Sequence, residues 1–167
     1  MTFQSHGLEI AAFEESDLST QYLSWLNNGQ HMRFSRQSQL THDFNSARNY
    51  LETFRGSGNK FLSIKKNGLL IGTATMYVNK DFGTCSAGIM IGSDHAGRGY
   101  GKIAWALLIG EVASSLGVRK VNAGTLKENK PMLRLFETSG MELEAVLKDE
   151  GVLDGKPMDI ILYRHFL

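Results

Sequence analysis

The spacing of apolar and polar residues changes several times along the chain, and each change marks a predicted element. A short apolar run at residues 8–13 predicts a strand, and it leads into apolar positions at helical spacing across residues 18–26. Residues 30–40 are mostly polar and predict a loop. Within residues 44–54 an apolar stripe recurs at intervals of three and four, which is typical of an amphipathic helix. The first third of the chain is therefore predicted as strand, helix, loop, helix.

The middle of the chain carries the strongest turn signal. Asn67 and Gly68 separate two strand-like runs, residues 61–66 and 69–78. Asn-Gly favours a two-residue hairpin turn because both positions need a positive φ angle. A further strand over residues 84–92 continues the meander, so three antiparallel strands are expected here.

The last third returns to alternating helices and strands. Apolar residues cover most of the circumference of residues 100–116, which predicts a largely buried helix. Residues 120–125 follow as a strand, residues 132–138 as a short helix, and residues 141–150 and 156–165 as a final pair of strands. The whole order predicts an α/β fold in which helices cover both faces of a mostly antiparallel, seven-stranded sheet.

Composition favours one ordinary globular domain, which we expect to span residues 1–167. Hydrophobic residues make up 42% of the chain and charged residues 21%, so there is enough apolar mass for a core and too little charge for a disordered chain. The 18 basic and 17 acidic side chains give a net charge of +1, so no overall field attracts nucleic acid or an anionic membrane. An anionic ligand therefore needs a local site.

Two further features bear on the compartment. The single cysteine, Cys85, cannot form an internal disulfide, and we expect a small buried residue rather than a nucleophile. Residues 1–16 carry acidic side chains where a secretion signal needs a basic start, and the longest apolar run, residues 103–109, is too short for a membrane helix. We therefore expect a cytoplasmic protein with no membrane partner.

One segment has the composition of an anion site. The sequence Gly-Arg-Gly-Tyr-Gly-Lys at residues 97–102 opens the predicted buried helix, where free backbone N–H groups and the positive end of the helix dipole bind phosphate. It is not a Walker loop, because Ala96 stands where glycine is required and Ile103 where serine or threonine is required. Its glycine spacing also differs from the dinucleotide-binding motif. Taken alone, the segment also fits a glycine-rich turn without a ligand.

Together with its surroundings, the glycine loop resembles a known family. The loop at residues 97–101, the strand before it at residues 88–92, and Asn129 with the Gly-Met pair at residues 140–141 are similar to the acetyl-CoA-dependent N-acetyltransferases of the GNAT superfamily. The order of the predicted elements is also the one that this family uses. The resemblance covers nearly the whole chain.

The resemblance implies acetyl-CoA as co-substrate and no metal. In the family, pantetheine lies like an extra strand between the strand before the loop and the strand after the buried helix. A backbone N–H near Met90 or Ile91 would polarise the thioester carbonyl, and the glycine loop would hold the pyrophosphate. Asn129 can be a helix cap alone or also a ligand to the pantetheine amide. The residues expected at acetyl-CoA are Ile89, Met90, Ile91, Gly97, Arg98, Gly99, Tyr100, Gly101, Lys102, Asn129 and Phe136.

Several positions depart from the family pattern. Asp94 stands where the loop usually begins with glutamine or arginine, and Ala96 stands where an arginine is common. Phe136 and Met132 replace the tyrosine or serine found in many relatives, where the tyrosine protonates the leaving thiolate, and Ser86 replaces a frequent glutamate. The chain therefore inherits no strong general base from the family. This favours an acceptor amine of low pKa over a lysine side chain.

Proton transfer needs a base and an acid. We interpret Glu150 or the adjacent Asp149, near the end of a predicted strand, as the base and Tyr77 as the acid. The alternative for each is structural: a solvated carboxylate at a strand end and a tyrosine packed on a sheet face. We expect the acceptor pocket between the first two helices, the loop at residues 30–40 and the last hairpin.

The segments at residues 25–28 and 154–159 are similar to the RimJ/RimL-like branch of the family, which includes acetylases of protein N-termini and of nucleotide-linked amino sugars. We therefore expect an enzyme that moves acetyl from acetyl-CoA directly to a primary amine in a ternary complex. A nucleotide-linked amino sugar or another small amine is favoured, because Arg33, Arg36 and His31 can hold a diphosphate. The alternatives are a protein N-terminal acetyltransferase, an acetyl-CoA-binding module without catalysis, and a nucleotide-binding domain. Related proteins are often dimers, so the resemblance also allows a homodimer.

Overall fold

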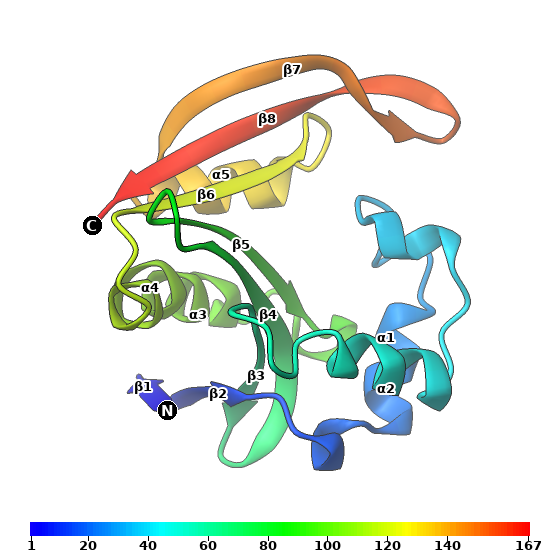
Figure 1. Cartoon of the computed structure of the whole chain (residues 1–167). Coiled ribbons are helices and arrows are strands. Elements are labelled where there is room, and N and C mark those ends of the chain that lie inside the picture. Colours follow the sequence, from blue (N-terminus) through cyan, green and yellow to red (C-terminus); the bar gives the residue numbers. More distant parts are fainter.

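Eight strands form one sheet in the computed structural model, which describes residues 1–167 (Figure 1). Their order across the sheet is β1-β2-β3-β4-β5-β6-β8-β7, and every neighbouring pair is antiparallel except β5 and β6. The predicted α/β fold with a mostly antiparallel sheet is confirmed. No helix is long and apolar enough to cross a membrane. The strands are β1 (Thr2–Ser5), β2 (Leu8–Ala12), β3 (Lys60–Lys66), β4 (Leu69–Asn79), β5 (Thr84–Ile91), β6 (Lys120–Leu126), β7 (Glu142–Leu153) and β8 (Lys156–Phe166).

The prediction of seven strands was wrong, and the missed strand is β1. Its residues alternate between exposed and half-buried, so it has no apolar run. It reaches β2 through a tight turn at His6 and Gly7, which have positive φ angles of 50° and 73°. Histidine is uncommon at positive φ, so this turn lacks the Asn-Gly signal that identifies the hairpin between β3 and β4.

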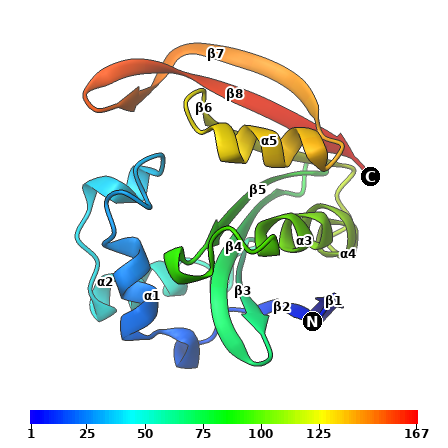
Figure 2. The same ribbon diagram turned by 180° about the vertical axis from the view of Figure 1, so that it is seen from behind.

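Helices cover both faces of the sheet, as predicted (Figures 1 and 2). One face carries α1 (Thr20–Leu26) and α2 (Phe44–Glu52). The opposite face carries α3 (Tyr100–Leu107), α4 (Ala113–Ser115) and α5 (Lys130–Thr138). A π-helical segment, Leu108–Val112, joins α3 to α4, so these pieces make up the single buried helix predicted over residues 100–116.

Two apolar clusters fix the helices to the sheet. The larger cluster packs α3, α4 and α5 against the sheet around the fully buried Trp105. The smaller cluster lies under α1 and α2 and is rich in aromatic residues, with Trp25 fully buried. Ile89 and Ile91 of β5 contact the larger cluster, and Met90 contacts the smaller. The end of β5 is therefore packed from both faces of the sheet, which holds the backbone of this strand in a fixed position.

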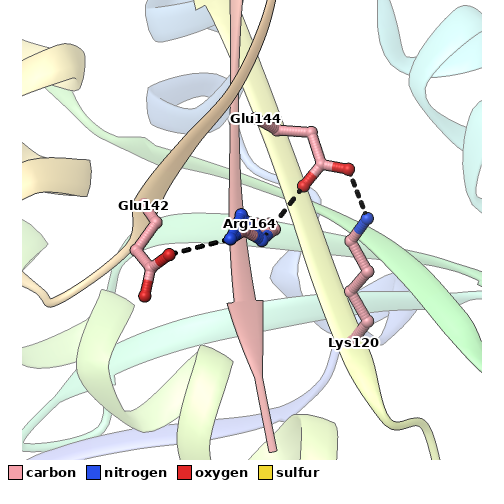
Figure 3. Close-up of polar contacts among 4 residues, drawn as sticks. All are labelled: Lys120, Glu142, Glu144 and Arg164. Atoms are coloured by element: carbon pink, nitrogen blue, oxygen red, sulfur yellow. Dashed lines mark hydrogen bonds and ion pairs between the residues drawn. The ribbon is translucent and has the colours of Figure 1, made fainter.

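β6, β8 and β7 form an arm of the sheet that is crossed by a network of ion pairs (Figure 3). Lys120 Nζ on β6 lies 2.6 Å from one carboxylate oxygen of Glu144 on β7. Arg164 on β8 lies 3.4 Å from the other Glu144 oxygen and 2.8 Å from Glu142. Glu144 thus connects both outer strands across the strand between them.

β7 extends to Leu153, past the predicted end at residue 150, because its pairing with β8 shifts register between Leu147 and Gly151. Asp149 lies in this bulge with a φ angle of 52°, and its backbone N–H donates to Asp159 Oδ1 at 3.2 Å. The extra residues carry Glu150 out of the regular strand pairing.

Candidate active site

The sheet opens between β5 and β6. The two strands pair only where Thr84, Cys85 and Ser86 face Lys120, Val121 and Asn122. Beyond this point β6 continues along β8, while residues 87–91 of β5 keep a strand partner on the β4 side alone. The ribbons of β5 and β6 diverge accordingly in Figure 2. One edge of β5 is therefore left without a neighbouring strand, as the resemblance implied for the pantetheine site.

The backbone groups on this edge can be assigned by strand alternation. The N–H of Gly92 donates to Ile71 O of the β4 strand at 2.8 Å. Because successive residues of a strand point their N–H and C=O groups to opposite sides, the N–H of Met90 also points toward β4, whereas those of Ile89 and Ile91 point to the open side. Of the two residues expected to polarise a carbonyl, Ile91 has the suitable N–H and Met90 does not.

A cleft of about 670 Å³ lies along this edge, and we call it the donor cleft. It runs between β5, the start of α3, the end of β6 and α5. The residues predicted at acetyl-CoA that line it are Ile89, Met90, Ile91, Gly97, Gly99, Tyr100, Gly101, Asn129 and Phe136. Arg98 and Lys102 are exposed next to it and form no ion pair. The structure therefore brings the predicted residues together around one cavity.

The glycine loop presents free backbone donors. No backbone N–H from residue 97 to residue 102 donates a hydrogen bond within the protein. Gly97 and Gly99 have φ angles of 75° and 78°, and Gly99 caps α3 without a side chain that could satisfy these groups. A row of unpaired N–H groups at a helix start, with the positive end of the helix dipole behind it, is a binding site for phosphate groups.

Asp94, which departs from the family pattern, fastens this loop to α1. Its carboxylate accepts hydrogen bonds from Gln21 Nε2 at 2.8 Å and from Trp25 Nε1 at 3.4 Å. The hydrogen bonds from Gln21 and Trp25 hold the pKa of the Asp94 carboxyl below its usual range. Gly92 lies directly beneath the Trp25 ring, where any side chain would overlap it. The strand end and the helix are therefore in close contact before the loop begins.

Asn129 and Phe136 occupy one wall of the donor cleft. Asn129 Oδ1 accepts from the Met132 N–H at 3.4 Å, which confirms the predicted helix cap, and its Nδ2 donates to Thr125 Oγ1 at 2.9 Å. Phe136 is 2% exposed, and its ring lies 5.3 Å from the ring of Trp105. The second expected role of Asn129, as a ligand, stays a prediction.

A second cavity, which we call the polar pocket, adjoins the donor cleft and measures about 920 Å³. The loop at residues 29–39 and the β7–β8 hairpin supply most of its walls, which matches two of the three predicted walls. Arg33 Nη2 and Asp154 Oδ2, one from each wall, form an ion pair at 3.3 Å. The charged side chains that line it are Arg33, Arg36, Glu150 and Asp154.

A third cavity, which we call the apolar pocket, lies between the sheet and the first two helices. Its volume is about 170 Å³. Burial raises the pKa of Tyr22 and of Tyr50 well above the ordinary value for tyrosine, so both hydroxyls stay protonated at neutral pH. Its lining residues are Tyr22, Leu26, Met32, Ser35, Gln37, His42, Ala47, Tyr50, Phe61, Thr73, Ala74, Thr75, Gly88, Ile89 and Met90.

The predicted base Glu150 and the predicted acid Tyr77 lie in different surroundings. Glu150 lines the polar pocket from the β7 bulge, and its carboxylate forms no ion pair. Tyr77 lines neither the donor cleft nor either pocket. Its hydroxyl lies 3.0 Å from that of Tyr50, which lines the apolar pocket. Tyr77 does not reach the donor cleft, and its role as the acid stays a prediction.

Three buried side-chain nitrogens have no hydrogen-bond partner: His31 Nε2, His95 Nε2 and Trp105 Nε1. All three residues line the donor cleft. Unpaired buried polar groups are rare, so their concentration at one cavity marks it as a site for a polar ligand or water. Sequence reasoning missed Trp105, since one tryptophan in an apolar helix signals only a core position.

Cys85 is buried at 2% exposure, as expected, and burial raises the pKa of its thiol to about 11. Burial and a raised pKa both disfavour a nucleophilic role for this thiol. No group of three or more histidine, cysteine, aspartate or glutamate side chains is placed to hold a metal ion.

Comparison with known proteins agrees with this geometry. A family model described as an acetyltransferase (GNAT) domain matches residues 8–142. An uncharacterized N-acetyltransferase p20 of Bacillus licheniformis is 24% identical over 157 residues, which cover 90% of this chain and 86% of that protein.

Two solved structures share the fold. RimL, a ribosomal L7/L12 alpha-N-protein acetyltransferase in complex with coenzyme A, has a TM-score of 0.87 at 17% identity. The alignment covers 98% of this chain and 96% of the RimL chain. The microcin C7 self-immunity acetyltransferase MccE, in complex with acetyl-CoA and AMP, has a TM-score of 0.85 at 16% identity. The alignment covers 98% of this chain and 94% of the MccE chain.

Proposed function

Because the chain belongs to the GNAT acetyltransferase family, we propose that it transfers an acetyl group from acetyl-CoA to a small primary amine by direct attack in a ternary complex. The observation that carries this proposal is the uninterrupted row of unpaired N–H groups at residues 97–102, next to the unpaired edge of β5. Phosphate and amide groups of one extended donor can bind to these two features at the same time.

On this proposal each wall of the donor cleft has one task. The glycine loop binds the pyrophosphate, with Arg98 and Lys102 adding positive charge at its rim. The open edge of β5 pairs with the pantetheine amides. The N–H of Ile89 or Ile91 then donates to the thioester oxygen as negative charge develops there, and one such donor contributes about 2.7–4 kcal/mol to transition-state stabilisation.

The remaining steps are proton transfers. The amine nitrogen must be neutral to attack the thioester carbon, and Glu150 on the polar pocket accepts its proton on this proposal. The carbon–sulfur bond breaks and the sulfur leaves as a thiolate. A free thiol has a pKa of about 8.5, so this leaving group needs little help near neutral pH.

The charges of the polar pocket bear on the acceptor. Arg33 and Arg36 favour an acceptor with a phosphate or another anionic group, such as a nucleotide-linked amino sugar. A low-pKa amine is also favoured, because neutralising an amine of pKa 10.4 at pH 7 costs about 4.6 kcal/mol and one of pKa 7.8 only about 1 kcal/mol. The MccE structure is a complex with both acetyl-CoA and AMP, which supports an acceptor linked to a nucleotide.

A second candidate acceptor is a protein N-terminus. RimL, described as an alpha-N-protein acetyltransferase, shares the fold, and the α-amine of a peptide satisfies the same pKa argument. Glu150 and Asp154 in the polar pocket can bind its ammonium group before deprotonation.

The experiment is a binding titration followed by a turnover panel. Calorimetry with acetyl-CoA tests the donor cleft alone. Release of free CoA thiol is then measured with amino-sugar nucleotides, free amino sugars and peptides with a free N-terminus. Turnover confined to peptides would reverse our order of acceptors. Tight acetyl-CoA binding without any turnover would instead indicate a binding module that lacks catalysis.

A matched pair of variants sharpens the acceptor assignment. Arg36→Gln is expected to raise KM for nucleotide-linked acceptors about tenfold and to leave KM for uncharged amino sugars unchanged. Arg55→Gln, at a surface ion pair with Glu52 outside the polar pocket, should change neither value. Equal effects of Arg36→Gln on both acceptor types would argue against an anionic acceptor.

A further inference from the structure

The apolar pocket is joined to the donor cleft and not to the wall that holds the acceptor charges. Five lining residues are common to the apolar pocket and the donor cleft: Met32, Ser35, Gly88, Ile89 and Met90. Ser35 alone is common to the apolar pocket and the polar pocket. The shared stretch at residues 88–90 lies beside the N–H groups that the proposed function assigns to the thioester oxygen. A group entering the apolar pocket from the reaction centre therefore comes from the donor side.

The boundary between the two cavities includes a glycine and two methionines. Gly88 has no side chain, and a Cβ there would lie 3.0 Å from Thr75 Oγ1, a residue of the apolar pocket. Met32 and Met90 also line both cavities, and methionine side chains are long, unbranched and flexible. Ile89 is the one branched side chain at this boundary, and no charged side chain lies there.

The pocket has the size and chemistry of a hydrocarbon site. Its volume of about 170 Å³ compares with the roughly 150 Å³ of a protein cavity that binds benzene, so it has room for about four to six carbon atoms. Tyr22, Tyr50 and Phe61 supply aromatic walls. His42 is the one imidazole, and its Nε2 lies 3.1 Å from the Gln37 carbonyl. Lysine, arginine and carboxylate side chains are missing from the lining, which disfavours a charged ligand.

We propose that the apolar pocket binds the hydrocarbon tail of an acyl group longer than acetyl, so that the protein also uses short-chain acyl-CoA donors such as butyryl-CoA. This inference rests on the proposed function of the donor cleft. The reaction keeps the same balance: the acceptor nitrogen bonds to the acyl carbon, the carbon–sulfur bond breaks, the electron pair leaves with the CoA sulfur, and the amine proton passes to Glu150.

The test needs no knowledge of the acceptor. Free CoA, acetyl-CoA and butyryl-CoA are titrated into the whole protein by calorimetry. Burial of two further methylene groups corresponds to about tenfold tighter binding, so butyryl-CoA is expected to bind about tenfold more tightly than acetyl-CoA. Equal or weaker binding of butyryl-CoA would overturn the inference, including the case in which the pocket serves an apolar part of the acceptor.

Variants on the helix side of the pocket sharpen the test. Ala47 of α2 lines the apolar pocket but not the donor cleft, and Ala47→Leu fills the pocket. It should abolish the advantage of butyryl-CoA and keep the acetyl-CoA Kd within twofold. Thr73 lines the same pocket, and Thr73→Val keeps its side-chain volume almost constant. This variant should still bind butyryl-CoA more tightly than acetyl-CoA. Equal weakening of both donors by Ala47→Leu would contradict the proposal.

Two outcomes separate the inference from the function beneath it. If acetyl-CoA does not bind at all, the donor cleft is wrongly assigned and both proposals fail. If acetyl-CoA binds and butyryl-CoA binds no better, the acyl pocket alone fails. If Ala47→Leu does not fold, as judged by circular dichroism, Gly88→Ala takes its place, because it narrows the passage between the two cavities. The affinities of acetyl-CoA and butyryl-CoA for the unaltered protein and for Gly88→Ala then decide whether the apolar pocket binds the acyl group.

Discussion

The donor cleft and the polar pocket share four lining residues, Phe34, Ser35, Gly124 and Thr125, yet most of their walls come from different parts of the chain. The groups of the donor cleft that bind the donor on our proposal are backbone groups, at the open edge of β5 and at the start of α3. The polar pocket is mainly side chains from a loop and a bulged hairpin. Arg33 and Asp154, which face each other there, are separated by 121 residues in the sequence.

The difference shows where each kind of information resides. A backbone site is determined by glycine positions and strand pairing, which are local and leave a motif in the sequence. A side-chain site depends on segments that meet only in the folded protein. The family can therefore be identified from the donor cleft, and the acceptor has to be inferred from charges in the polar pocket.

The largest expected effect is at the backbone-built region. Gly92→Ala places a Cβ in severe overlap with the ring atoms of the buried Trp25. We expect it to lower the free energy of unfolding by about 3 kcal/mol, since neither the strand end nor the tryptophan has room to move. Chemical denaturation measures the change. Gly110→Ala, where a Cβ would meet nothing within 4 Å, should stay within about 0.5 kcal/mol of the unaltered protein.

The next effect tests the side-chain region. Glu150→Gln should lower kcat about a hundredfold, because the amide cannot accept the amine proton, and should leave the acetyl-CoA Kd unchanged. Steady-state kinetics with the best acceptor of the panel measures it. Asp149→Asn, on the same bulge but outside the polar pocket, is the control and should keep kcat within about twofold. An unchanged kcat in Glu150→Gln would remove Glu150 from the mechanism.

The third effect returns to the donor cleft. Gly99→Glu puts a negative side chain among the free N–H groups, and we expect acetyl-CoA to bind about thirtyfold more weakly. Gly117→Glu has the same conformational strain, with a φ angle of 67° against 78°, at a helix end outside the cleft. Calorimetry should find its affinity unaltered. Equal losses in both variants would point to strain and not to phosphate binding.

A smaller effect is expected at the ion pair that spans the polar pocket. Arg33 and Asp154 are exposed, so Asp154→Asn should change the free energy of unfolding by less than about 1 kcal/mol. Asparagine tolerates the φ angle of 51° at this position. A larger loss by thermal denaturation would mean that side chains hold the pocket walls together as firmly as backbone pairing holds the donor cleft.

The smallest effect concerns pH. Hydrogen bonds from Gln21 and Trp25 lower the pKa of the Asp94 carboxyl in the folded protein. The ionised carboxylate therefore contributes its full stabilisation at pH values above the ordinary aspartate pKa near 4. This contribution is lost as the pH falls through the lowered pKa. The stability difference between the unaltered protein and Asp94→Ala should therefore shrink between pH 6 and pH 3. Denaturation at both pH values measures it, and a constant difference would contradict this role for the carboxylate.

Sequence reasoning was accurate where local chemistry determines the structure. The Asn67-Gly68 hairpin, the buried helix from residue 100 and the cap at Asn129 all depend on neighbours within a few residues. It failed for β1, whose turn at His6 carries no recognisable signal, and for the length of β7, where a bulge at Asp149 extends the strand.

The same rule applies to the site. Most residues of the glycine loop and of the β5 edge that a motif marks do line the donor cleft, and their contact with acetyl-CoA stays a prediction. The apolar pocket was not foreseen, since Ala47 and Tyr50 of α2 and Gly88 of β5 come from two elements that are far apart in the sequence. Tyr77 lies on the sheet face toward α2, a placement that only the register between β4 and β5 reveals.

The contact between Gly92, Asp94 and α1 has a mechanical consequence. The segment that leaves the end of α1 is the same loop that supplies Arg33 and Arg36. The phosphate-binding turn and the arginine-bearing loop are therefore both anchored to α1, so a displacement of this helix would move the two ends of the active site together.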